Sequence, residues 1–232
     1  MRLGRANIGE IEYWFRPGTS DKKTFEEVVG KNVYQKRGMR ILQGEEWADC
    51  GANVGAFTVL AAGLGANVTA YEPDPGNCKM IEKNLALNKL DANIVNAGLV
   101  HNDIKRANLY AGNNGNTWRN SMLKNWNGKG LVVDTLNFDD SIKDGICVKM
   151  DIEGMEMPIL ENTKRIFSKM VYEWSFDIDP SLSRFWKIID RQKSDYEVAF
   201  EEHRTCYDDK REVLWQKSWF PACTNVFLFK KK

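Results

Sequence analysis

Two acidic residues and two glycines stand at fixed spacing where the chain reads as strand, turn, helix and second strand. Asp49 and Gly51 follow a short apolar run, Gly55 comes four positions after Gly51 and opens a helical pattern, and Glu72 ends the next apolar run. This order is typical of a βαβ unit that binds a nucleotide at its glycine turn. The chemistry to determine is therefore which nucleotide binds.

The turn lacks the features of two common nucleotide sites. A dinucleotide site needs a second glycine close to the pyrophosphate, whereas Asn53 stands there, and no Lys-Ser or Lys-Thr follows Gly55 to bind phosphates. A ligand with an adenosine and no phosphate remains, and S-adenosylmethionine fits. Asp49 would lie near its positively charged methionyl end, and Glu72 would accept from both ribose hydroxyls. The alternative is a structural turn whose glycines serve packing only.

Acidic side chains also follow two later apolar strands. Asp151 ends the run at 146–151, and Glu173 lies in the run at 169–175. Ligands of open α/β sheets bind outside the carboxyl ends of the strands, so both side chains should face the cofactor and the acceptor. Glu156 more simply favours a helix start, where the helix dipole stabilises a carboxylate. The residues predicted to bind the cofactor are Asp49, Gly51, Asn53, Gly55, Glu72, Pro73, Asn96, Ala97 and Asp151.

A polar loop is predicted at residues 111–130, which hold six asparagines and four glycines. Long loops in compact domains are usually functional, and this one carries Trp118, Arg119 and Asn120. An aromatic ring beside hydrogen-bonding groups suits a carbohydrate or another polar ligand. We expect these residues to bind the acceptor, with a flexible surface loop as the alternative.

Composition sets limits on the kind of protein. The 232 residues are 43% apolar, which suits one α/β domain, and the net charge of +1 gives no overall field for nucleic acid or an anionic membrane. Five cysteines without C-x-x-C spacing indicate reduced thiols, and no apolar stretch is long enough to span a bilayer. We expect a cytoplasmic protein that does not bind a membrane, and the composition disfavours nucleic acid as a partner. The oligomeric state stays open.

The elements that must position these residues follow from periodicity and turn signals. Residues 8–15 alternate like a strand, and residues 24–29 read as a short helix closed by Gly30. We predict that residues 1–40 form a hairpin and helix extension that caps the cofactor site, and that residues 41–232 form the cofactor-binding domain. The other predicted elements are helices at 75–88, 159–167 and 181–190, and strands at 92–97, 107–110, 131–135, 196–200 and 224–229, the last two as an antiparallel pair.

Three segments together resemble one known family. DCGANVGAFT at 49–58, YEPDP at 71–75 followed by NLALN at 84–88, and VKMDIEGME at 148–156 resemble the FkbM family of S-adenosylmethionine-dependent methyltransferases. The likeness spans roughly residues 8 to 175, since RPGTSD at 16–21 and Tyr34 also resemble the family's lead-in. It implies a Rossmann-like class I methyltransferase fold, with a seven-stranded, mostly parallel sheet, an antiparallel C-terminal strand and helices on both faces.

The resemblance also implies an activity and further site residues. Members generally methylate hydroxyl oxygens of small molecules, often sugars, so the implied function is O-methylation of a sugar or a sugar-containing small molecule or glycan. Glu153 belongs to the matched strand-end signature and Ser121 falls near a family serine, so both join the predicted acceptor site. The family often places Glu-x-His after the fifth strand, where this chain has Glu173-Trp-Ser175.

A neutral hydroxyl is a poor nucleophile, so a base or a metal ion should assist the transfer. The chain has only His101 and His203, and the second lies in a charged stretch typical of a surface. Carboxylates are therefore the better candidates for the base or for oxygen ligands of a divalent ion such as Mg²⁺ or Mn²⁺, and metal dependence stays open. The predicted catalytic residues are Asp151, Glu173 and Asp177.

Two alternatives remain beside a sugar O-methyltransferase. An RNA ribose 2′-O-methyltransferase also has acids at these strand ends together with lysines, a role open to Lys149 or Lys164. The near-neutral charge disfavours RNA binding. The second alternative is a methyltransferase-like module that binds a nucleoside or sugar without catalysis.

Overall fold

The structure is a computed structural model. It describes residues 2–112, 117–125, 130–176, 178–202, 205–207, 213–215 and 223–232 of the chain.

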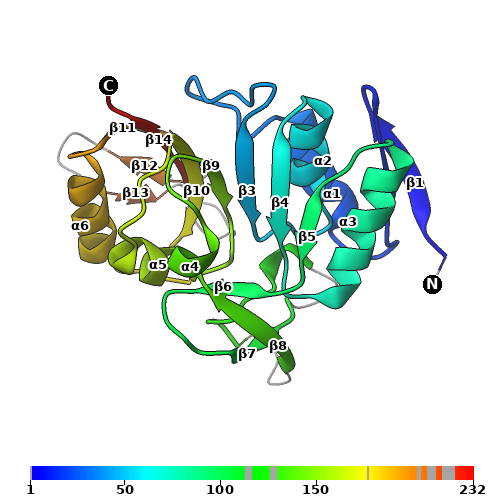
Figure 1. Ribbon diagram of the computed structural model, residues 1–232. Coiled ribbons are helices and arrows are strands. Elements are labelled where there is room, and N and C mark those ends of the chain that lie inside the picture. Colours follow the sequence, from blue (N-terminus) through cyan, green and yellow to red (C-terminus); the bar gives the residue numbers. More distant parts are fainter. Residues whose placement is uncertain are drawn as a thin grey trace.

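A seven-stranded sheet forms the centre of the molecule (Figure 1). Its strand order is β11-β14-β10-β9-β3-β4-β5, and all pairs are parallel except those of β14, which runs antiparallel to both neighbours. The sheet confirms the predicted α/β fold with one antiparallel C-terminal strand. The strands are β3 (Glu46–Cys50), β4 (Asn67–Tyr71), β5 (Asn93–Val95), β9 (Cys147–Met150), β10 (Lys169–Ser175), β11 (Tyr196–Glu202) and β14 (Cys223–Lys230).

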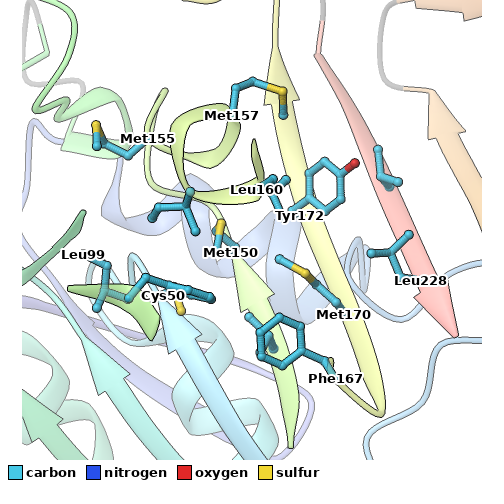
Figure 2. Packing of buried hydrophobic residues seen from close by; sticks show 14 of the residues in the cluster. Cys50, Leu99, Met150, Met155, Met157, Leu160, Phe167, Met170, Tyr172 and Leu228 are labelled. Atoms are coloured by element: carbon cyan, nitrogen blue, oxygen red, sulfur yellow. The ribbon is translucent and has the colours of Figure 1, made fainter. Parts of the chain in front are cut away.

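Helices cover both faces of this sheet because successive strand residues point to opposite sides. Met150 and Tyr172 lie in the apolar cluster packed by α4 (Phe138–Ser141), α5 (Glu156–Asn162) and α6 (Leu182–Gln192), which Figure 2 shows in part. Cys147 and Val171 lie in the opposite cluster with α2 (Ala56–Gly63) and the N-terminal segment. Residues of α3 (Pro75–Leu87) pack beside α2 on that second face. Both layers are therefore built from the predicted apolar patterns.

The N-terminal segment is a hairpin followed by a helix. Strands β1 (Gly4–Ile8) and β2 (Ile11–Phe15) pair antiparallel, so the single strand predicted at 8–15 is wrong: the chain turns at Gly9, whose φ is 58°. Helix α1 (Asp21–Phe25) follows and runs into a π-helical turn at Glu26–Gly30. The ring of Tyr13 stacks on that of Phe25 with a centroid distance of 4.2 Å, and the backbone N–H of Trp14 donates to Asn84 of α3. The hairpin is thereby fixed to the second sheet face.

Helix α5 is shorter than its apolar pattern predicted. It ends at Asn162, where Thr163 adopts an extended backbone and donates its hydroxyl to Asp139 at 2.5 Å. Phe167 is buried against Phe138, with ring centroids 5.9 Å apart, although it lies in the connection to β10. Ile166 and Phe167 continue the apolar spacing because they pack in the same core as α5, so the predicted helix at 159–167 is correct only in its first part.

Smaller sheets complete the described part of the chain. Strands β6 (Gly98–Val100), β8 (Gly130–Asn137) and β7 (Arg106–Tyr110) form a sheet in that order below the main one (Figure 1). Strands β12 (Thr205–Tyr207) and β13 (Val213–Trp215) pair with each other. The polar loop returns to the β7 edge, where Ser121 and Tyr110 exchange two backbone hydrogen bonds. The loop is thus fixed next to the main sheet's rim.

A buried ion pair joins the two central strands. Asp49 on β3 and Lys149 on β9 are register partners, the carboxylate and ammonium lie 3.0 Å apart, and Asp49 also accepts from the Thr58 hydroxyl at 2.6 Å. Burial lowers the pKa of Lys149, but the charges of Asp49 and Asp151 outweigh it and raise that pKa overall. Lys149 therefore keeps its positive charge in the folded protein.

We expect Lys149→Met to lower the free energy of unfolding by about 3–5 kcal/mol, because it leaves the Asp49 charge buried without its partner. Urea unfolding followed by circular dichroism measures this. Arg106→Ala is the matched control, since it removes an exposed ion pair with Asp134 and should cost no more than about 1 kcal/mol. Equal losses for the two variants would contradict the importance of the buried pair.

Candidate functional site

The site lies where the strand order reverses, between β3 and β9. From β3 the chain adds β4 and β5 on one side, and from β9 it adds β10 on the other. Gly51 follows β3 with φ of 78°, and a Cβ atom built on it would lie 1.9 Å from the carbonyl oxygen of Asp151, which follows β9. Only glycine fits this approach. The switch point of an open α/β sheet is the place where such folds bind ligands.

A cavity of about 480 Å³ opens at this edge. Its walls come from the two strand-end turns, the end of β4, the β6 region and the polar loop. Six residues predicted to bind the cofactor line it: Gly51, Asn53, Glu72, Pro73, Ala97 and Asp151. Two residues predicted to bind the acceptor, Asn120 and Glu153, line it as well. The remaining lining residues are Tyr71, Asn77, Gly98, Leu99, Leu109, Thr117, Met122 and Ile152.

Glu72 is buried and lines the cavity from the end of β4. One of its oxygens accepts from the backbone N–H of Asn53 at 2.8 Å, and the other accepts from the backbone of Asp74 at 2.9 Å and from Asn77 Nδ2 at 3.2 Å. Burial raises its pKa to about 7, although the three N–H donors act in the opposite direction. Its carboxyl therefore titrates near neutral pH at the expected ribose position.

A closed ring of hydrogen bonds ties Glu72 to the N-terminal segment and to the polar loop. Asn53 Nδ2 donates to the carbonyl of Thr117 at 2.9 Å, and the Thr117 hydroxyl donates to Asp21 at 3.0 Å. Arg16 donates twice to Asp21, and its Nη2 donates at 2.7 Å to the side chain of Asn77. Asn77 completes the ring at the Glu72 carboxylate. The N-terminal residues 16–21 thus help to position the cavity wall.

The carboxyl groups of Asp151, Glu153 and Glu173 lie close enough to interact, and the first two of these residues line the cavity while Glu173 does not. Asp151 accepts a hydrogen bond from the hydroxyl of Tyr34 at 2.7 Å. Burial, followed by the charge of Asp151, raises the pKa of Glu153 and of Glu173 well above the usual range. The charge of Arg119 acts in the opposite direction on Glu153. Both groups therefore hold their protons to a higher pH than an exposed glutamate does.

Glu156 holds the turn that presents these groups. It is the first residue of α5, and its carboxylate accepts from the backbone N–H groups of Ile152 at 2.6 Å and Gly154 at 2.7 Å. Between them Glu153 has a left-handed φ of 53°. Burial and the charge of Asp151 raise the pKa of Glu156 to about 7. These bonds support the prediction that Glu156 serves the start of the helix.

The polar loop supplies one side of the cavity. Its described part includes the 3₁₀ turn Thr117–Arg119 that carries Trp118, and Asn120, which lines the cavity. Ser121 is buried, donates its hydroxyl to the carbonyl of Glu153 at 2.5 Å and accepts from two backbone N–H groups. Its hydroxyl fixes the loop to the acidic turn. The side chain of Trp118 and the predicted catalytic residue Asp177 lie outside the described residues.

Three of the predicted cofactor residues lie behind the lining. Asp49 is fully buried in its ion pair with Lys149, and Gly55 caps α2 with φ of 86°. The Asn96 side chain donates to the carbonyls of Glu72 and Pro73, which orders the end of β4. Their cofactor contacts stay predictions.

Several residues at the site were not predicted from the sequence. Tyr34 and Thr117 reach it through hydrogen bonds from distant segments, and Asn77 bonds to Glu72 from the start of α3. Of these three residues only Tyr34, in the lead-in, carried any signal. Met122 packs so close to Gly98 that a Cβ there would lie 2.5 Å from its sulfur. Apolar lining residues of this kind have the same sequence pattern as core residues, so periodicity does not distinguish them.

The described residues do not bring together three or more His, Cys, Asp or Glu side chains in a metal-binding arrangement. The possible divalent ion therefore stays a prediction, and no step below is assigned to it. Within the same described ranges, none of the helices combines the length and apolar character needed to cross a membrane.

The fold is that of a class I S-adenosylmethionine-dependent methyltransferase. It has the strand order of that class, a cavity at the switch point of the sheet, and the acidic residue Glu72 at the end of β4. The chain belongs to the methyltransferase FkbM domain family, whose model matches residues 49–199. No match was found among curated proteins.

Three solved structures share the fold. The tRNA (uracil-54, C5)-methyltransferase of Pyrococcus abyssi, in complex with S-adenosyl-L-homocysteine, is 15% identical with a TM-score of 0.52, over 97% of this chain and 44% of that one. The M. jannaschii tRNA m1G37 methyltransferase is 14% identical with a TM-score of 0.51, over 99% of this chain and 55% of that one. The putative transferase PH0793 of Pyrococcus horikoshii is 14% identical with a TM-score of 0.50, over 99% of this chain and 72% of that one. This chain thus spans less than two thirds of the first two, and the likeness shows the fold alone.

We expect S-adenosylhomocysteine to bind more tightly as the pH rises from 6 to 8. Ionised Glu72 can accept from both ribose hydroxyls, and with a pKa of about 7 it is largely protonated at pH 6. The affinity should rise by up to about tenfold per pH unit below 7 and level off above it. Calorimetry across this range measures the effect. Glu72→Gln should bind weakly with no such pH dependence, and a wild-type pH profile in this variant would assign the titration to another group.

Proposed function

We propose that this chain transfers a methyl group to a hydroxyl oxygen of a sugar or of a sugar-containing small molecule or glycan. The observation that carries the proposal is the placement of Asp151. Its carboxylate lines the cavity at the end of β9, its backbone lies against Gly51, and its Oδ2 already accepts from Tyr34. A carboxylate there can take a proton from an acceptor hydroxyl.

S-adenosylmethionine, when bound, supplies the methyl group on a positively charged sulfur. The cavity suits it, because Gly51 allows close approach to the turn and Glu72 presents a buried carboxyl at the expected ribose position. In the proposed reaction Asp151 accepts the hydroxyl proton through Oδ1. The new oxygen–carbon bond then forms as the carbon–sulfur bond breaks, which leaves S-adenosylhomocysteine and a protonated Asp151. Positioning in line supplies much of the rate.

Charge at the acceptor end supports a neutral acceptor. Burial and the charge of Asp151 raise the pKa values of Glu153 and Glu173, which favours their neutral forms, and a neutral carboxyl group can donate a hydrogen bond to a sugar oxygen. Asn120 adds an amide on the same wall. The negative charge of a phosphate-rich acceptor would be repelled by the acidic cluster of Asp151, Glu153 and Glu173. We therefore assign an uncharged polyol surface to this end.

The bonding of Lys149 disfavours the RNA ribose alternative. Its ammonium is buried, lies 3.0 Å from Asp49 and donates to the carbonyl of Gly51 at 2.8 Å, so it serves the central strands. Lys164 is exposed after the end of α5, where its backbone N–H bonds to Asp139, on the way to the amino end of β10. Lys149 lies near enough to Asp151 for their charges to interact, but its ammonium is already held by Asp49 and the carbonyl of Gly51.

The predicted cytoplasmic location also belongs to this proposal. The three cysteines Cys50, Cys78 and Cys147 are free thiols, and all three are buried. Burial raises the pKa of each of these three thiols, which keeps them protonated and unreactive. Such a set suits a reducing compartment.

We expect Asp151→Asn to lower methyl transfer by at least about a hundredfold, because the amide cannot accept the hydroxyl proton. The assay follows labelled methyl from S-adenosylmethionine into a panel of neutral methyl glycosides, nucleosides and RNA. Asp134→Asn, an exposed change on β8, is the control and should keep wild-type transfer.

The outcomes separate the alternatives. Activity near wild type in Asp151→Asn would remove Asp151 as the base, and label found only in RNA would favour the ribose methyltransferase. Binding of S-adenosylhomocysteine without transfer to any acceptor would favour the non-catalytic module. A lack of binding to either cofactor form would overturn the proposal.

A further inference from the structure

Tyr34 connects the N-terminal segment to the proposed base. It lies before the stretch matched by the family model, which begins at residue 49. Its hydroxyl donates to Asp151 Oδ2 at 2.7 Å, and only 5% of the residue is exposed. A residue far away in the chain thus makes a direct hydrogen bond to the carboxylate at the acceptor end.

The position of Tyr34 is fixed from two sides. Its ring meets that of Phe57 of α2 edge to face, with centroids 5.9 Å apart. The ammonium of Lys149 lies 5.5 Å from the centre of the ring and is itself held by Asp49. The hydroxyl therefore reaches Asp151 from a side chain with little freedom to move.

Tyr34 can act only as a donor in this contact. Burial and the charges of Asp151, Glu173 and Asp49 raise its pKa well above the usual value, so the hydroxyl keeps its proton at all physiological pH values. Asp151 itself faces the acids Glu153, Glu156 and Glu173 and the cation Lys149. A neutral donor stabilises and orients the carboxylate among three acids without adding a charge.

We propose that Tyr34 is a positioning residue that holds the Asp151 carboxylate with Oδ1 directed at the acceptor hydroxyl. The inference rests on the proposed function, since it gives Tyr34 a role only if Asp151 is the base. It makes the N-terminal segment part of the catalytic apparatus, in addition to the cap predicted from its sequence.

The test uses Tyr34→Phe, which removes the hydroxyl and keeps the ring contacts. We expect kcat to fall by about tenfold or more, as for loss of a hydrogen bond to a charged group, with the S-adenosylhomocysteine affinity within about twofold of wild type. Tyr13→Phe is the matched control, because Tyr13 is another buried tyrosine of the same segment, stacked on Phe25 and remote from Asp151 in the contacts. It should keep wild-type kcat.

A double-mutant cycle shows whether Tyr34 acts through Asp151. In the Asp151→Asn background, Tyr34→Phe should cause no further loss of transfer, and thermal unfolding of the four proteins should show a coupling between the two sites. Each of four results would overturn the proposal. Tyr34→Phe could keep the wild-type kcat, Tyr13→Phe could lose as much kcat, or the loss in Tyr34→Phe could be confined to cofactor affinity. The fourth result is that the effects of Tyr34→Phe and Asp151→Asn add up in the double variant. An active Asp151→Asn variant would instead overturn the proposed function. If no panel acceptor is methylated, the stability cycle decides, and an absent coupling rejects the contact.

Discussion

The close approach of two backbone turns is the constraint on which the rest of the site depends. Gly51 after β3 and Asp151 after β9 meet at the switch point so tightly that any side chain at Gly51 would overlap the Asp151 carbonyl. The two central strands can lie in register because Asp49 and Lys149 neutralise each other inside the sheet. Cofactor turn and proposed base are therefore placed by one packing arrangement, at the edge where open sheets bind ligands.

Several carboxyl groups are buried around this contact, and burial raises their pKa values to different extents. Glu72 and Glu156 titrate near neutral pH while they bind backbone N–H groups, and Glu153 and Glu173 are driven toward their neutral forms. Asp151 accepts the hydrogen bond from Tyr34, and Lys149 lies nearby. These two contacts, together with its place on the cavity wall, distinguish Asp151 from the other acids as the proposed base.

The sequence predicted what is local and periodic. The glycine turn, Glu72 and Asp151 stand beside strand ends, so their spacing indicated that they lie at the cavity, and the family resemblance implied helices on both faces of the sheet. It failed where distant segments meet. Helix α5 ends where Thr163 bonds to Asp139, 24 residues away. The hydrogen bond of Tyr34 to Asp151 spans 117 positions of the chain, and that of Thr117 to Asp21 spans 96. No short-range pattern contains such contacts.

The most direct test of the central claim is a crystal structure of the protein with S-adenosylhomocysteine. The account predicts that both ribose hydroxyls lie within about 3 Å of the Glu72 carboxylate, with the sulfur directed toward Asp151. An adenosine bound away from Glu72, or a sulfur directed away from Asp151, would contradict it.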